Sequence, residues 1–199
     1  MSRMRKVLVR DGAGRISVIE EPVPQVGRGE VLIKVKVSSI SPGTGLGPIR
    51  KLRQNPEPSR GPMAFGYSNA GVVEKVGEGC KRLKAGMEVA AMGGGYAVDG
   101  TWAVVPENLC IEKPAEVSFE AASYCHLCAT ALHAIQRGRV RICENVAVCG
   151  LGPVGHFAGQ IARAAGAHVV GLDLLPFRLE MARKAGAADL ALQPVDAEE

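Results

Sequence analysis

The segment Gly150-Leu-Gly-Pro-Val-Gly155 constrains the fold of this chain more than any other part of its 199 residues. Its glycines have GxGxxG spacing, and it stands between a short apolar stretch, residues 145–149, and a helical pattern over residues 156–165. A second apolar stretch, residues 168–172, ends at Asp173, which lies 23 residues after Gly150. A strand, a glycine turn, a helix and a second strand that ends in an acid predict the start of a doubly wound parallel sheet.

Each residue of this pattern has a physical role in binding a dinucleotide. Gly150 permits the tight turn, Gly152 lets the backbone approach a pyrophosphate, and Gly155 lets the helix pack closely on the strand. The helix N-terminus offers free N–H groups and a positive dipole end to the phosphates. Asp173 would accept hydrogen bonds from the adenosine ribose and repel a 2′-phosphate, which favours NAD over NADP. The alternatives are a glycine turn that binds nothing and a site for FAD.

The first part of the chain consists of short strand patterns separated by glycine and proline turns. Residues 31–37, VLIKVKV, alternate apolar and charged side chains, which is typical of a strand with one face exposed. Glycine-rich turns such as residues 77–79 and 93–95 separate these stretches. Many short strands of this kind predict a barrel or a sandwich. Further strands are expected at residues 6–10, 16–20, 71–76, 87–92 and 101–105.

The pattern changes near Pro114. Ser118 is a candidate N-cap for an alanine-rich helix that runs to about Gln136. Beyond the glycine motif, residues 177–185 predict another helix and residues 188–192 a third strand. Because alternating strands and helices imply parallel pairing, the predicted fold class is β followed by α/β. The expected domains are residues 1–117 and 118–199.

The composition excludes several classes of protein. Hydrophobic residues make up 47% and charged residues 22%, as in globular domains, and no apolar run approaches the roughly 18 residues of a membrane helix. The N-terminus lacks the apolar stretch of a secretory signal, so we expect a cytoplasmic protein that binds no membrane. The basic segment containing Arg50, Lys51, Arg53 and Arg60 has no interleaved aromatic residues, so we expect no nucleic acid. We interpret it as a solvated loop, with a local role near an anionic substrate as the alternative.

The six cysteines are expected to be free thiols in a reducing compartment. Cys125 and Cys128 have CxxC spacing, but no second pair exists to complete a zinc site. They lie in the alanine-rich helical pattern, where cysteine behaves as a small core residue. We therefore interpret them as core residues, with a metal or redox pair as the alternative.

Four longer segments carry a resemblance to a known family: VLIKVKVSSIS, FGYSNAGVVEKVGEGCKRLKAGMEVAAMG, VSFEAASYCHLCATALHAI and VAVCGLGPVGHFAGQIARAAGAHVVGLD. Through them, essentially the whole chain resembles the medium-chain dehydrogenase/reductase superfamily, near its alcohol, sorbitol and threonine dehydrogenase branch. The resemblance implies a GroES-like β-barrel followed by a Rossmann domain, which is only partial in this sequence. It also implies hydride transfer between nicotinamide and a small alcohol or carbonyl substrate, and homo-oligomers among full-length relatives.

The chain departs from the zinc-dependent members of that family at their metal ligands. Those members carry a cysteine where this chain has Ser41, and Gly-His-Glu where it has Gly66-Tyr67-Ser68. Their third ligand, a cysteine or an acid, falls near His126. A serine hydroxyl and a neutral tyrosine are not usual zinc ligands, and the family's four closely spaced structural cysteines are absent. We therefore expect neither a catalytic nor a structural zinc.

Hydroxyl and imidazole groups are then the candidates to act on the substrate oxygen. Tyr67 stands at the lost histidine position, and Thr44 resembles the proton-relay hydroxyl of the family. His126 is a candidate general acid, because imidazoles titrate near neutral pH. The alternatives are simple packing of the Tyr67 ring and a buried hydrogen bond at His126.

The resemblance also adds expected cofactor contacts outside the glycines and Asp173. Thr130 aligns with a threonine on the nicotinamide side, and Val154, with Pro153, lies in the turn beneath the cofactor. Arg178 resembles a basic residue beside the adenosine ribose, with a solvated helix charge as the alternative.

The leading hypothesis is an NAD-dependent, zinc-independent oxidoreductase acting on a small alcohol, polyol, aldehyde or ketone. A non-catalytic nucleotide-binding relative is the second, and an NADPH-dependent quinone or enoyl reductase, which Asp173 disfavours, is the third. Only 49 residues follow Gly150, whereas a doubly wound sheet has two βαβαβ halves. We therefore expect a sequence that stops within its nucleotide-binding domain, exposes apolar sheet edges, and binds NAD weakly without turnover.

Overall fold

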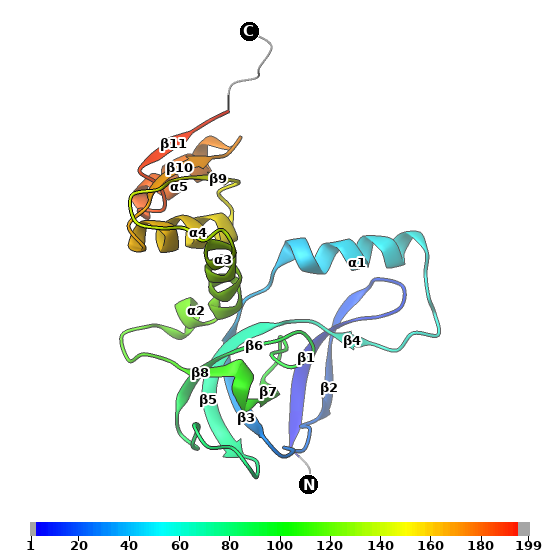
Figure 1. Cartoon of the computed structure of the whole chain (residues 1–199). Helices are drawn as coiled ribbons and strands as arrows, with labels where there is room; N and C mark the ends of the chain where they lie inside the picture. The colour runs from blue at the N-terminus through cyan, green and yellow to red at the C-terminus, as the bar shows by residue number, and fades with distance from the viewer. Residues whose placement is uncertain (1–2, 195–199) are drawn as a thin grey trace. The chain divides into compact units, whose positions relative to one another are not determined.

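A computed structural model describes residues 3–194 of the chain, and it divides into two compact units (Figure 1). The first unit extends to His126, and the second begins at Leu127. Within residues 3–194, no helix combines the length and the apolar character needed to cross a membrane.

The first unit is built from two antiparallel sheets. One sheet has the strand order β2-β1-β4 and the other β7-β3-β5-β6-β8. A short 3₁₀ turn, η1 (Glu107–Leu109), precedes the last strand. The strand bounds are β1 (Met4–Arg10), β2 (Ile16–Pro22), β3 (Glu30–Ser38), β4 (Met63–Ala64), β5 (Ser68–Val76), β6 (Glu88–Met92), β7 (Trp102–Pro106) and β8 (Cys110–Glu112).

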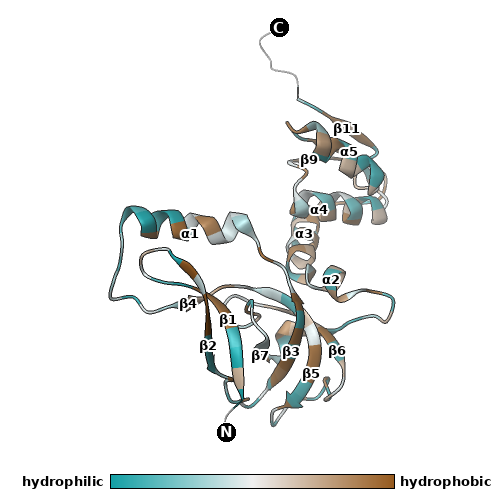
Figure 2. Ribbon diagram, turned by 180° about the vertical axis from the view of Figure 1, so that it is seen from behind, coloured by the Kyte–Doolittle hydropathy of each residue, from teal (hydrophilic) through white to brown (hydrophobic). Residues whose placement is uncertain are grey.

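Apolar side chains of both sheets form the core of this unit. In β3, Val31 and Ile33 are fully buried, while Lys34 is exposed, as the alternation in the sequence indicates. Figure 2 shows β3 and β5 as largely hydrophobic strands. The other fully buried valines of the core are Val7, Val73, Val89 and Val105. Burial on the inward face explains why these residues are β-branched, since such side chains suit a half-buried pleated surface.

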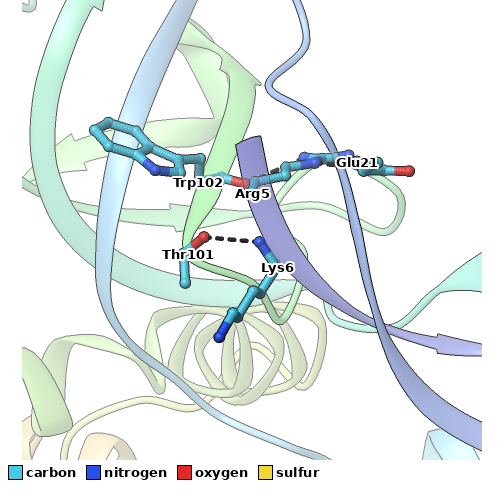
Figure 3. A network of polar contacts seen from close by, with 5 residues as sticks. All are labelled: Arg5, Lys6, Glu21, Thr101 and Trp102. Carbon is cyan, nitrogen blue, oxygen red and sulfur yellow. Dashed lines mark hydrogen bonds and ion pairs between the residues drawn. The ribbon is translucent and has the colours of Figure 1, made fainter. Parts of the chain in front are cut away.

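Polar contacts join the two sheets where β1 passes the start of β7 (Figure 3). The backbone N–H of Lys6 donates to Thr101 Oγ1 at 3.0 Å, and the N–H of Thr101 donates to the Lys6 carbonyl at 2.9 Å. The Arg5 guanidinium donates to the Trp102 carbonyl at 3.1 Å and pairs with the Glu21 carboxylate of β2. These contacts close the two sheets into a barrel around their common core, as the sequence predicted for this part of the chain.

Helix α1 (Pro42–Gln54) corrects one expectation from the sequence. The interpretation as a solvated loop is wrong for Arg50, Lys51 and Arg53, which lie in this helix, whereas Arg60 does lie in a loop. Three glycines and Pro48 within the helix hide its periodicity. Pro42 occupies the first turn, where proline is favoured, and Ile49 and Leu52 are buried. Burial of these two side chains therefore outweighs a poor helix propensity.

The expected single helix from Ser118 to Gln136 is also corrected, because the structure has two helices, α2 (Phe119–Ala122) and α3 (Cys125–Arg137). Ser118 caps α2 as predicted, accepting from the Ala121 N–H at 3.2 Å. The break falls at Ser123, whose carbonyl accepts from the hydroxyls of Ser39 at 2.9 Å and Ser68 at 2.6 Å. These side chains take the place of the helical N–H donor, so the helix ends there and restarts.

The second unit contains a three-stranded parallel sheet of order β11-β10-β9. Its strands are β9 (Asn145–Cys149), β10 (His168–Leu172) and β11 (Leu190–Leu192). Helix α4 (Pro153–Ala164) packs on β9 and β10, and α5 (Pro176–Lys184) packs on β10 and β11. Parallel pairing and the positions of these elements confirm the expectation of alternating strands and helices, and the fold class of β followed by α/β is confirmed.

The edge strand of this sheet carries exposed apolar side chains. Leu190 is 50% exposed and Leu192 is 43% exposed, while Ala191 between them is buried. Residues 195–199 lie outside the described residues.

Candidate functional site

The barrel unit contains a pocket of about 280 Å³. Its volume is just below the range of about 300–1,000 Å³ that is typical of small-molecule sites. The ends of β1 and β3, the start of α1 and the segment around β4 supply its walls. The polar wall residues are Arg10, Ser39, Ser41, Thr44, Tyr67 and Asp99. Two of the predicted catalytic residues, Thr44 and Tyr67, therefore lie on one pocket, together with Ser41.

A positive-φ backbone at Gly66 places Tyr67 in this wall. Gly66 has φ +103°, and a Cβ there would stand 2.3 Å from the backbone nitrogen of Asp99. The chain passes this closely because the Asp99 N–H donates to the Phe65 carbonyl at 2.8 Å. The Gly93 N–H donates to the Tyr67 carbonyl at 2.8 Å and fixes the other side. Only glycine satisfies both the positive φ and the close approach.

His126, the third predicted catalytic residue, contacts Tyr67 but is not a wall residue of the pocket. The two rings meet edge to face, with centroids 4.5 Å apart and planes at 63°. His126 Nδ1 lies 3.1 Å from the Tyr67 carbonyl oxygen. Because a carbonyl only accepts, Nδ1 carries the proton in this bond, and in the neutral ring Nε2 is then the acceptor. The geometry brings the two predicted residues together and makes the imidazole a support for the tyrosine.

A buried serine holds the start of α3 beside this pair, and sequence reasoning missed it. Ser68 is fully buried, its hydroxyl donates to the Ser123 carbonyl at 2.6 Å, and it accepts from the His126 N–H at 3.3 Å. The helix break at Ser123 is therefore what brings His126 to Tyr67. An isolated serine in an apolar strand is the signal that could have revealed it, since a buried hydroxyl requires partners.

Cys125 of the CxxC pair packs against a small core cluster, as the core interpretation predicts, whereas Cys128 is half-buried. Cys125 Sγ lies 3.4 Å from the Ala91 carbonyl and 3.5 Å from the Ser68 hydroxyl. Burial raises the pKa of the Cys125 thiol, which favours the protonated form, whereas a metal site needs the thiolate. Within residues 3–194, no three His, Cys, Asp or Glu side chains converge as metal ligands would.

The donor set at the positions of the family's zinc ligands does not fit a zinc ion. Ser41 and Tyr67 offer neutral hydroxyls, and His126 uses Nδ1 on a backbone carbonyl. Zinc in proteins is held by thiolate, imidazole and carboxylate groups, so one imidazole would be left to bind it.

The glycine turn of the second unit has the geometry that its sequence predicts. Gly150 has φ +93°, and its N–H donates to the Leu172 carbonyl at 2.7 Å. A Cβ on Gly155 would stand 1.9 Å from the Gly150 carbonyl oxygen, so α4 packs directly against the turn. Gly152 is the N-cap of α4 and supplies no side-chain hydrogen bond, with Pro153 following it in the first turn. Free N–H groups at such a helix end attract phosphate.

Gly152 provides a test of whether a dinucleotide fits here. A Cβ at this position would meet no atom within 4 Å, and its φ of −74° suits any residue. The fold itself therefore does not require glycine there. A ligand that must approach the backbone closely does require it, so these residues fit the pyrophosphate of a dinucleotide.

Asp173 ends β10 as predicted, and its carboxylate is engaged by the chain itself. Oδ1 accepts from the Leu175 N–H at 2.9 Å, and Oδ2 accepts from the Leu151 N–H at 2.8 Å. Arg178 pairs with the same carboxylate at 3.3 Å. The Leu175 N–H, then the Leu151 N–H and Arg178, hold the pKa of Asp173 below its usual value. A carboxylate has about four acceptor positions, so about one remains for a ribose hydroxyl.

A pocket of about 610 Å³ adjoins this carboxylate. Gly150, Asp173 and Arg178 line it together with the apolar side chains of Leu172, Leu174, Leu175 and Pro194. Apolar walls with a carboxylate and a guanidinium at one side suit an adenosine, whose base is flat and whose ribose carries hydroxyls. The structure thus brings Gly150, Asp173 and Arg178 into one place.

The remaining predicted cofactor residues lie on helices of the second unit. Val154, in the first turn of α4, is 38% exposed. Thr130 lies on α3 and is exposed. Their contacts with a cofactor stay predictions.

Comparison with known proteins agrees with this arrangement. Residues 27–115 match the alcohol dehydrogenase GroES-like domain, and residues 153–199 match a family described as zinc-binding dehydrogenase. An alcohol dehydrogenase of Rhizobium meliloti (strain 1021) is 31% identical over 218 residues, which cover 92% of this chain and 62% of that protein. The sorbitol dehydrogenase of Mus musculus is 31% identical over 214 residues, covering 94% and 59%. The chain thus spans about 60% of the length of these relatives.

A solved structure shows the same fold. The alcohol dehydrogenase superfamily protein of Novosphingobium aromaticivorans has a TM-score of 0.81 and 27% identity, over 96% of this chain and 58% of that one. The two matched families correspond to the GroES-like barrel and to part of the Rossmann sheet. The chain belongs to the medium-chain dehydrogenase/reductase superfamily.

Proposed function

We propose that this chain supplies the barrel and the first part of the nucleotide-binding unit of an NAD-dependent oxidoreductase that works without zinc. Its substrate would be a small alcohol, polyol, aldehyde or ketone. The observation that carries the proposal is the open space at Gly152, beside a helix end without a capping side chain. Relatives named alcohol and sorbitol dehydrogenase support the reaction class.

The barrel pocket supplies the groups that act on the substrate oxygen. A dinucleotide held at the glycine turn and Asp173 would supply the acceptor for the substrate's hydride. Tyr67 in the pocket wall donates a hydrogen bond to the substrate oxygen, which stabilises its developing negative charge. Thr44 is exposed at the start of α1, so its hydroxyl accepts the alcohol proton and passes it to solvent. His126, which contacts the Tyr67 ring edge to face and lies with Nδ1 3.1 Å from the Tyr67 carbonyl oxygen, orients the tyrosine and is the candidate general acid beside it.

The preference for NAD over NADP is proposed from the adenosine pocket. The Asp173 carboxylate remains ionised because its surroundings lower its pKa, so a 2′-phosphate would meet a negative charge. Arg178, whose side chain is 39% exposed, offsets part of that charge. We therefore expect a preference for NAD that is weaker than a lone aspartate would give.

Two measurements on the 199-residue chain test the nucleotide and metal parts of the proposal. NADH fluorescence titration should show binding, weaker for NADPH, and Gly152→Val should reduce it because its side chain fills the open space. Elemental analysis of protein purified without added metal should find zinc well below one per chain. Stoichiometric zinc, or NADH affinity unchanged in Gly152→Val, would contradict the corresponding part.

A non-catalytic nucleotide-binding relative is the second candidate. Ser41 and Tyr67 at the zinc-ligand positions favour it, since a chain freed from catalysis has no need of those ligands. Protein made from the complete coding sequence distinguishes the two, when NADH is offered with a panel of small aldehydes and ketones. Oxidation of NADH supports the enzyme, and binding without turnover supports the alternative.

The cytoplasm is the proposed compartment. All six cysteines are free thiols, and Cys110 is buried with its pKa raised to about 12 by desolvation. A reducing compartment is where such a set of thiols persists.

A further inference from the structure

Two charged side chains in the wall of the barrel pocket lack partners for polar atoms within the described chain. Arg10, the last residue of β1, lies over the ring of Phe65, with Cζ 5.5 Å from the ring centroid. Its Nε is buried without a hydrogen-bond partner, and its guanidinium forms no ion pair with any residue of 3–194. A guanidinium has five N–H donors in a fixed fork, so this one is available to a ligand.

Asp99 stands in the same wall and is 6% exposed. Two hydrogen bonds fix the backbone of Asp99. Its N–H donates to the Phe65 carbonyl, and its own carbonyl accepts from the Leu8 N–H at 2.9 Å. The Ser38 side chain hydrogen-bonds to its carboxyl group, but Oδ1 is buried without a partner. The chain therefore fixes the position of the Asp99 carboxyl group but leaves its Oδ1 without a hydrogen bond.

Unpartnered buried polar atoms are few among residues 3–194, and two of them belong to residues that line this pocket. Among residues 3–194, the buried side-chain atoms without a partner are Arg10 Nε, Asn69 Oδ1 and Asp99 Oδ1. Such an atom costs about 1–3 kcal/mol, and more where the group is charged. An arginine without an ion pair and an incompletely hydrogen-bonded carboxyl group that line one pocket point to a ligand with an acceptor for the first and a donor for the second.

We propose that the barrel pocket recognises a small hydroxycarboxylic acid, with its carboxylate on Arg10 and one hydroxyl donating to Asp99. Thr44 and Tyr67 line the same pocket, and their hydroxyl groups would contact the remaining carbinol. This inference deepens the proposed function, on which it rests for the identity of the reacting hydroxyl. The recognition by Arg10 and Asp99 stands apart from the cofactor, because both residues belong to the barrel unit.

A carboxylate suits the chemistry of Arg10 better than a neutral hydroxyl does. A carboxylate matches the planar guanidinium with two parallel hydrogen bonds, whereas a neutral hydroxyl supplies a single uncharged acceptor. The Phe65 ring against the guanidinium excludes water from one face and strengthens such a pair. A neutral polyol of the same length would leave these donors poorly matched, so the pocket should discriminate against it.

Glycerate and glycerol form the test pair, since they share three carbons and differ by one carboxylate in place of a hydroxymethyl group. Isothermal titration of the 199-residue chain, without cofactor, should show glycerate binding at least about tenfold more tightly than glycerol. Propionate, which lacks both hydroxyls, should bind several-fold more weakly than glycerate. Equal binding of glycerate and glycerol would overturn the proposal, as would tighter binding of serine, whose ammonium group would then be the preferred donor to Asp99.

Variants at Arg10 locate the effect. Arg10→Met should bring the ratio of glycerol to glycerate dissociation constants close to one, and Arg10→Lys should retain part of it. Arg50→Met removes the same charge from an exposed position on α1 and should leave the ratio unchanged. If Arg10→Met fails to fold by circular dichroism, Arg10→Lys decides, and an unchanged ratio in that variant overturns the proposal.

The outcome is separable from that of the proposed function. If the chain binds NADH normally but does not prefer glycerate over glycerol, the carboxylate inference alone is overturned. Absence of NADH binding with the preference intact would overturn the nucleotide part of the proposed function alone.

Discussion

Two buried aspartates, one in each unit, show how differently the same side chain is used. Asp173 in the nucleotide-binding unit accepts from two backbone N–H groups and pairs with Arg178, and these contacts lower its pKa. Asp99 in the barrel has a hydrogen bond with the Ser38 side chain, and burial raises the pKa of its carboxyl group. Most acceptor positions of the first carboxylate are filled by its own chain, whereas the second has an oxygen without a hydrogen-bond partner. A carboxylate whose acceptors are mostly used by backbone N–H groups stabilises the fold as well as binding a ligand. A buried carboxyl group with an unused acceptor is a candidate for ligand recognition.

The largest expected effect is a difference in stability between variants of Gly155, which packing requires, and of Gly152, which only a ligand requires. Gly155→Ala should destabilise the nucleotide-binding unit by about 3 kcal/mol, because its Cβ would overlap the Gly150 carbonyl oxygen. Gly152→Ala should stay within about 1 kcal/mol of the wild type, because its Cβ meets nothing, yet it should weaken NADH binding. Urea unfolding followed by circular dichroism and NADH titration measures both. Equal free energies of unfolding for the two variants would contradict this difference between the two glycines.

A smaller effect is expected at the buried serine of the barrel. Ser68→Ala removes the donor to the Ser123 carbonyl and the acceptor of the His126 N–H, and should cost about 1–3 kcal/mol. Trp102, the single tryptophan, lies in β7 and reports on the barrel by its fluorescence. Ser39→Ala is the matched control, since it removes only one donor to the same carbonyl and should cost less. The reverse order would mean that Ser68 does not organise this turn.

Asp173 in the nucleotide-binding unit should contribute less to the stability of the fold as the solution becomes acidic. Because folding depresses its pKa, Asp173 contributes stability above its unfolded pKa and loses it as the pH falls through the lower folded value. Asp173→Asn should therefore melt a few degrees below the wild type at pH 7, with the difference shrinking below about pH 4. Melting followed by circular dichroism over this range tests it. A difference that does not depend on pH would show that charge is not the cause.

The barrel aspartate should show the smallest change and the opposite sign. Because folding raises its pKa, Asp99 favours the folded state below its unfolded pKa, and this advantage is lost as the pH rises through the folded pKa. Asp99→Asn removes the buried charge and should melt at or slightly above the wild-type temperature at pH 7, as followed by Trp102 fluorescence. In acid the two proteins should converge. A marked loss of stability at pH 7 would indicate that the ionised form has a partner in the fold.

The nucleotide-binding motif could be predicted because its residues are close in sequence. Gly150, Gly155 and Asp173 have roles that follow from a turn, a helix contact and a strand end, and the structure places each of them there. Short apolar stretches also located β9 and β10 with their observed bounds.

The barrel pocket could be predicted only in part, because its walls come from distant segments. Thr44 and Tyr67 were found through a family resemblance, but Arg10 and Asp99 are 89 positions apart and share a wall only through the closure of the sheets. Helix α1 was missed because its stability comes from burial of Ile49 and Leu52, which propensity does not register. The break at Ser123 was missed because the competing donors, Ser39 directly after β3 and Ser68 at the start of β5, lie far earlier in the chain.

That break has a consequence for how the chain opens. The His126 N–H donates to a side chain of β5 rather than to a helical carbonyl, while residues further along α3 belong to the second unit. In amide hydrogen exchange, His126 should therefore follow the opening of the barrel, and the middle of α3 should follow its own unit. One continuous helix would thus report on two cooperative unfolding events, divided within a single turn of its backbone.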